Sequence, residues 1–164
     1  MKSFSNNSFR GKMERFEKKQ EFIKGALAGL VASIVMFVFV EFFHWLGLTK
    51  FGISALAGDT VFTYKDNLEM NIIAFFIHCC IGVFWGVIIS FLFTKVFSTD
   101  FYPLKIIFIS FYIFFFHSGF LDDVFHYKRE FHKQTFDLLI ILSGYILYGF
   151  ILAIGLKRQG IIDD

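Results

Sequence analysis

Four long apolar runs constrain the fold of this chain more than any other feature of its sequence. They cover residues 25–48, 71–93, 104–121 and 136–156. A helix needs about 20 apolar residues to cross roughly 30 Å of hydrocarbon. In that layer a helix satisfies its own backbone polar groups. The runs therefore predict an all-α fold, an integral membrane bundle of four transmembrane helices that forms one domain over residues 25–156.

The composition excludes two other classes of protein. Hydrophobic residues make up 56% of the 164, and the mean hydropathy is +0.63, values that a soluble domain does not reach. The net charge of +2 is small, and the basic residues gather at the edges of the apolar runs, so we expect no nucleic-acid partner. Cys79 and Cys80 are adjacent inside a run, which excludes a disulfide-stapled secreted protein.

The distribution of basic residues predicts the orientation of the chain. Eleven of the 16 Lys and Arg residues lie in the segment 1–24, around the turn 95–105 and in the tail 157–164. Basic residues are retained on the cytoplasmic side of a membrane. We therefore expect both termini in the cytoplasm, which agrees with an even number of spans. The basic segment 1–24 is interpreted either as an amphipathic helix on the membrane surface or as a solvated tail.

Small residues recur at helical spacing in three of the runs. Such residues let the backbones of neighbouring membrane helices approach closely. His78 shares one helical face with Gly82 and Gly86, so we expect its side chain to point into the bundle. The same small-residue faces could contact a second copy or another membrane protein. The predicted packing residues are Gly25, Gly29, Gly82, Gly86, Gly149 and Ala153.

Ionisable and polar side chains concentrate toward the predicted outer face, and such groups inside a membrane suggest a functional site. We expect His78 to lie within hydrogen-bond or water-bridged reach of a polar side chain of another span, namely Tyr145, Glu41 or His117. Residues 49–70 between the first two runs carry turn-forming residues and no motif. The candidate cluster consists of His78, Glu41, His44, His117, Tyr145, Asp122, Asp123 and His126.

This pattern leaves several functions open. No nucleophile constellation, phosphate-binding loop or nucleotide motif occurs, so no catalytic residue is predicted and enzyme status stays undecided. The first hypothesis is a non-enzymatic accessory or scaffold protein with a structural polar cluster and no cofactor. The alternatives are a small ion- or proton-coupled transporter subunit and a membrane oxidoreductase. The oxidoreductase would hold a divalent metal, or a haem between two of the span histidines.

The chain resembles a group of uncharacterised bacterial four-helix inner-membrane proteins, the YqhR-like and YagU-like kind. The resemblance rests on Gly25-Ala-Leu-Ala-Gly29, Leu46-Gly47-Leu48, His78-Cys-Cys-Ile-Gly82 and Tyr148-Gly149. Proteins of this kind often carry a second histidine three residues before the last Tyr-Gly, where this chain has Tyr145. The resemblance implies the bacterial cytoplasmic membrane as the location and implies no catalytic residues.

Overall fold

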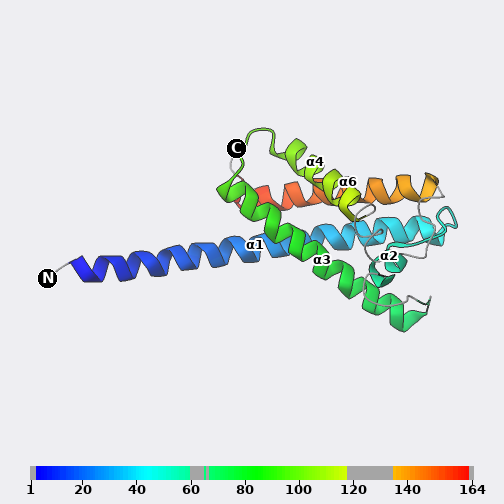
Figure 1. Ribbon diagram of the computed structural model, residues 1–164, viewed down its shortest axis with the longest axis horizontal. Helices are drawn as coiled ribbons and strands as arrows, with labels where there is room; N and C mark the ends of the chain where they lie inside the picture. The colour runs from blue at the N-terminus through cyan, green and yellow to red at the C-terminus, as the bar shows by residue number, and fades with distance from the viewer. Residues whose placement is uncertain (1–2, 60–64, 66, 118–134, 163–164) are drawn as a thin grey trace.

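The computed structural model describes residues 3–59, 65, 67–117 and 135–162, which form helices and turns and no strand. The predicted all-α class is therefore confirmed. Figure 1 shows α6 running beside α1 and α3 crossing α1 obliquely. The helices are α1 (Ser3–Trp45), α2 (Ile53–Asp59), α3 (Leu68–Lys95), α4 (Tyr102–Phe115) and α6 (Thr135–Arg158).

Within the part of the chain that the structure describes, three helices are long and apolar enough to cross a membrane: Gln20–Trp45 within α1, Leu68–Lys95 and Thr135–Arg158. They support an integral membrane protein. The 14 residues of α4 are apolar but shorter, and at about 1.5 Å per residue they extend roughly 21 Å. The third predicted span reaches residue 121, and residues 118–121 lie outside the described part of the chain. The count of four spans and the cytoplasmic termini remain predictions.

The crossing of α1 and α3 is built from small residues on both helices. A Cβ added to Gly29 would overlap the carbonyl oxygen of Gly82, and one added to Gly25 would lie 2.6 Å from the Cβ of Ser90. Gly86 in turn faces the backbone of Gly25 and Gly29. The backbones approach this closely because neither side of the contact carries a side chain. The structure thus places these four predicted glycines in one contact.

A second face of α1 packs against α6, and α6 carries α4 on its other side. A Cβ added to Gly155 would lie 3.0 Å from the Cβ of Ala28, and one added to Gly144 would lie 2.9 Å from Cγ2 of Val40. The sequence analysis did not identify Gly144 or Gly155 as packing positions. It did identify Gly149, which lies against the hydroxyl of Ser110, and Ala153, which is buried.

The loop 49–70, in which the sequence analysis identified turn-forming residues and no motif, also holds regular structure. It contains the short helix α2, which packs against α3 and α1. Ile53, Ala55 and Ala57 are buried there, with at most 5% of each residue exposed. The loop therefore folds back into the bundle and supplies part of its core.

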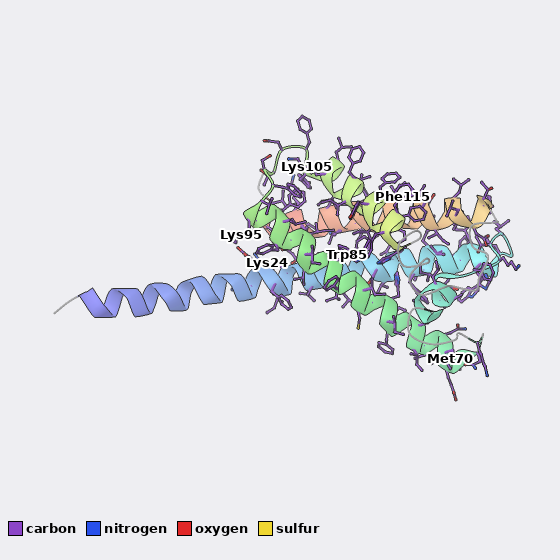
Figure 2. The ribbon with its side chains drawn as sticks, viewed as in Figure 1. Lys24, Met70, Trp85, Lys95, Lys105 and Phe115 are labelled. Carbon is purple, nitrogen blue, oxygen red and sulfur yellow. The ribbon has the colours of Figure 1, made fainter. Side chains whose placement is uncertain are left out.

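One end of the bundle is basic. Figure 2 shows Lys24, Lys95 and Lys105 at this end and Met70 at the opposite end of α3. Lys95 lies 3.8 Å from the carboxylate of Glu21. Beyond Lys24 the N-terminal part of α1 continues past the bundle in line with the span (Figure 1). The segment 1–24 was interpreted as a surface helix or a tail, and from Ser3 onward it is helical and continuous with the first span.

Candidate functional site

His78 lies inside the bundle, as its shared face with Gly82 and Gly86 predicted, and only 8% of it is exposed. Its Nε2 lies 3.1 Å from the carbonyl oxygen of Ser33 on α1. We had expected a side chain of another span as the partner of this histidine. The direct partner of Nε2 is a backbone carbonyl, which corrects that expectation. The reason is the close helix crossing, because Ser33 packs against Gly82 and brings the α1 backbone within reach.

His78 lines a cavity of about 90 Å³ in the middle of the described helices. Its walls are mostly apolar and come from α1, α2, α3, α4 and α6. The side chains with polar or polarisable atoms at the cavity are His78, His117, Tyr145, Tyr148, Trp85 and Met36.

His117 and Tyr145 form a hydrogen-bonded pair on the side of the cavity near α4 and α6. The Nδ1 atom of His117 lies 2.7 Å from the hydroxyl oxygen of Tyr145. The ring centroids of Trp85 on α3 and of His117 lie 6.2 Å apart, and both side chains line the cavity. The structure therefore brings three members of the predicted cluster, His78, His117 and Tyr145, to one cavity.

Tyr148 is a site residue that the sequence analysis missed. It is buried, and its hydroxyl donates a hydrogen bond of 2.8 Å to the carbonyl oxygen of Gly82. The signal was available, because Tyr148 and Tyr145 lie three positions apart on α6 and therefore on one side of the helix. Tyr148 had been noted only as part of the Tyr-Gly pair that carried the family resemblance.

Glu41 is separate from this cavity. It is 8% exposed, and its Oε1 accepts hydrogen bonds from the backbone N–H of Ser54 at 2.8 Å and from the Ser54 hydroxyl at 2.6 Å. The carboxylate also fills the space beside Gly52, where a Cβ would lie 2.5 Å from Oε2. The expectation that Glu41 pairs with His78 is therefore wrong. Glu41 holds the start of α2 against α1.

Two further polar side chains bind the same loop. Asp137 is 1% exposed, and both of its carboxylate oxygens lie within hydrogen-bond distance of the backbone N–H of Lys50, at 3.1 and 3.2 Å. On α1, the Nδ1 of His44 lies 3.1 Å from the carbonyl oxygen of Thr49. Three polar side chains from two helices therefore fasten residues 49–54. Of the remaining cluster members, Asp122, Asp123 and His126 lie outside the described residues.

The described residues contain no group of three or more His, Cys, Asp or Glu side chains placed to hold a metal ion. The volume of the cavity also bears on the haem alternative. At about 90 Å³ it is smaller than the roughly 150 Å³ that accommodates benzene. A porphyrin ring is several times larger than benzene, so the space between His78 and His117 does not fit one.

Comparison with protein-family models, with curated proteins and with solved structures finds no match to this chain.

Proposed function

We propose that this chain is a non-enzymatic integral membrane protein that serves as an accessory or scaffold subunit in a bacterial cytoplasmic membrane. The observation that carries the proposal is the use of its ionisable side chains. Glu41 and Asp137 each bind backbone N–H groups of the loop 49–54. His44 and His78 each bind a backbone carbonyl.

Catalysis by a general base requires a group that can reach a proton of the substrate. A buried carboxylate that already accepts two hydrogen bonds, as Glu41 does, is engaged in holding the fold. The same holds for Asp137, whose two oxygens meet one backbone N–H. These contacts support a structural role for the two acidic side chains. Any binding at the cavity would therefore use its neutral groups.

The packing of side chains in the region between the cavity and the basic end of the bundle does not favour an ion-coupled transporter. Tyr148 bonds to the carbonyl of Gly82 at the cavity wall. Farther toward the basic end, the described interior is filled by fully buried apolar side chains, including Ile106, Leu152 and Leu156. A polar path for an ion is therefore not continuous through the described part of one chain.

Association with a partner would use a different surface from the one the sequence suggested. Gly25, Gly29, Gly82 and Gly86 are occupied by contacts within this chain. Only 33% of each spanning window is buried, and the remainder carries large exposed apolar side chains. We propose that these outward faces contact the lipid bilayer and any second copy or partner subunit.

Reconstitution into liposomes tests the proposal. Liposomes that contain the purified protein should show the same proton and potassium permeability as empty liposomes, measured with an internal pH dye and a membrane-potential dye. The purified protein should also show no haem absorption and no stoichiometric metal. A flux that His78→Leu abolishes, with Tyr112→Phe on the exposed surface of α4 as the matched control, would establish a transporter in its place.

A further inference from the structure

The turn between α3 and α4 exposes large apolar side chains at the basic end of the bundle. It covers residues 96–101, after the end of α3 and before the start of α4. A turn that lies in water is commonly built from small and polar residues. Here Val96 is 62% exposed and Phe101 is 80% exposed, while Phe97 and Leu104 beside them are also exposed. Such an apolar surface indicates a contact with an apolar partner.

The backbone of the turn places the most exposed of these rings away from the protein. Phe101 has a φ of 52°, and among the described residues it is the one residue other than glycine with a positive φ. This left-handed conformation is unfavourable for a bulky side chain. The exposure of the Phe101 ring shows that packing within the chain does not compensate for it. Compensation would have to come from a contact outside the chain.

The length of α4 agrees with a turn that enters the bilayer. The 14 residues of α4 extend about 21 Å, whereas the hydrocarbon layer is roughly 30 Å thick. If α4 begins below the membrane surface, a thinner layer remains for the chain to cross. The apolar side chains of the turn would then contact acyl chains and not water.

Lys105 supplies a positive charge beside this apolar surface. Its Nζ donates hydrogen bonds of 3.0 Å to the carbonyl oxygen and to the hydroxyl oxygen of Ser98. An ammonium group has three N–H donors, so one remains for a further acceptor. No carboxylate of the described residues forms an ion pair with Lys105. A lysine near the membrane surface extends its ammonium toward the headgroups, where a phosphate can accept this bond.

The other charged groups of the turn fit the same arrangement. The Nζ of Lys95 lies 3.8 Å from the carboxylate of Glu21, which is longer than a hydrogen bond, so this charge is only partly balanced. Figure 2 shows Lys24 at the same end. Asp100 is exposed at the polar tip of the turn, where its negative charge can stay in the hydrated headgroup layer. The lysines on either side of the turn therefore favour an anion of the headgroup layer.

We infer that the α3–α4 turn is a membrane anchor that binds an anionic phospholipid. The rings of Phe97 and Phe101 lie among the acyl chains, and Lys105, assisted by Lys95, binds the lipid phosphate. This inference goes beyond the accessory role proposed above, which requires no particular lipid. Its failure would leave the flux measurements that test that role unchanged.

Spin labels measure the depth of the turn in the full-length protein. In a background with Cys79→Ala and Cys80→Ala, a nitroxide is attached at Val96→Cys or at Thr99→Cys, and the protein is placed in phosphatidylglycerol vesicles. The label at residue 96 should collide more often with oxygen, which partitions into lipid, than with a water-soluble nickel complex. The label at residue 99 should show the opposite preference. Phe101→Gly keeps the left-handed backbone and removes the ring, so it should move the label at residue 96 toward water.

Native mass spectrometry of the purified protein measures the choice of lipid. Phosphatidylglycerol titrated into the detergent solution should be retained in preference to phosphatidylcholine. Lys105→Gln can still bind Ser98 but carries no charge, and it should weaken retention of phosphatidylglycerol about fivefold. Lys65→Gln, at an exposed lysine near the opposite end, is the matched control and should change nothing. Inorganic phosphate should not displace the lipid, because it lacks acyl chains.

Three results would overturn the inference. Access of the nickel complex to residues 96 and 99 alike would place the whole turn in water. Equal retention of the two lipids, or equal losses in Lys105→Gln and Lys65→Gln, would show that surrounding lipid binds without recognition of its headgroup. Displacement by inorganic phosphate would indicate a site for a free anion and not for a lipid.

Discussion

Glu41 and Asp137 are buried carboxylates that each accept a hydrogen bond from a backbone N–H of one loop, and Glu41 also accepts one from the hydroxyl of Ser54. A buried charge is costly unless it is hydrogen-bonded, and so is a buried backbone N–H. Each pairing removes both penalties at once. The loop 49–54 consequently depends on two side chains that lie 13 and 87 residues away from the backbone groups they bind.

Glu41→Ala should destabilise the protein by about 1–3 kcal/mol, because it leaves the buried N–H of Ser54 without its acceptor. Glu41→Gln should cost less, since the amide oxygen can still accept one bond. Unfolding in mixed micelles with increasing SDS, followed by circular dichroism, measures the free energy of unfolding. Glu69→Ala, at an exposed carboxylate on α3, should change it by no more than about 0.5 kcal/mol. Equal effects at both positions would contradict the structural role of Glu41.

His78 illustrates what a sequence can and cannot predict about a single residue. Its inward orientation followed from a helical face shared with two glycines, which depends only on the periodicity of α3. Its partner did not follow, because a contact with the Ser33 carbonyl depends on how closely two helices cross. The partner of Glu41 was unpredictable for a similar reason, since it belongs to a loop whose path no periodic pattern describes.

The crossing of α1 and α3 brings the two backbones into contact, and Gly29 lies against both Gly82 and Gly86 there. Gly29→Ala would place a methyl group against the backbone of Gly82 and Gly86, which cannot move aside as a side chain can. Such overpacking costs about 1–3 kcal/mol. We expect this loss in the SDS unfolding assay. Val31→Leu adds volume on the exposed face of α1 and should be neutral.

A Gly29→Ala variant as stable as the parent protein would mean that the helices do not cross at this point. In that case the contact between His78 and Ser33, which depends on the same crossing, would also be incorrect. The two contacts are therefore tested together, although only one residue is changed.

The elements differ in how well the sequence predicts them. α1, α3 and α6 were predicted from hydropathy, because a membrane span is determined mainly by the length and composition of its own residues. α2 has seven residues and is too short to be stable alone. Its contacts with α3 and Glu41 stabilise it, so no pattern within residues 49–70 predicts it. Because α2 also forms part of the cavity wall, that part of the wall could not be predicted from the sequence either.

The described part of the molecule has a basic end and an opposite end that carries α2 (Figures 1 and 2). The two loop-binding carboxylates lie beside the segment that leads into α2. Lys24, Lys95 and Lys105 from three different segments meet at the basic end. If basic residues stay on the cytoplasmic side, α2 and the cavity lie toward the outer side.

Single cysteines test this orientation in intact cells. In a background with Cys79→Ala and Cys80→Ala, Ser8→Cys should be protected from an impermeant maleimide. Asp66→Cys and Lys128→Cys should react, because both positions fall in predicted outer loops. Permeabilised cells provide the control, in which all three positions should react. Protection of residues 66 and 128 together with reaction at residue 8 would reverse the proposed orientation.

The pairing of the helices also determines an order of assembly during synthesis. α1 and α3 share the glycine contact and are both made before α4, so this pair can form as soon as α3 has entered the membrane. α4 has its main described contact with α6, which is synthesised after it. A nascent chain that ends after α4 therefore holds one apolar helix without its partner, and the cavity closes only when α6 arrives. The arrival of α6 thus completes the described bundle.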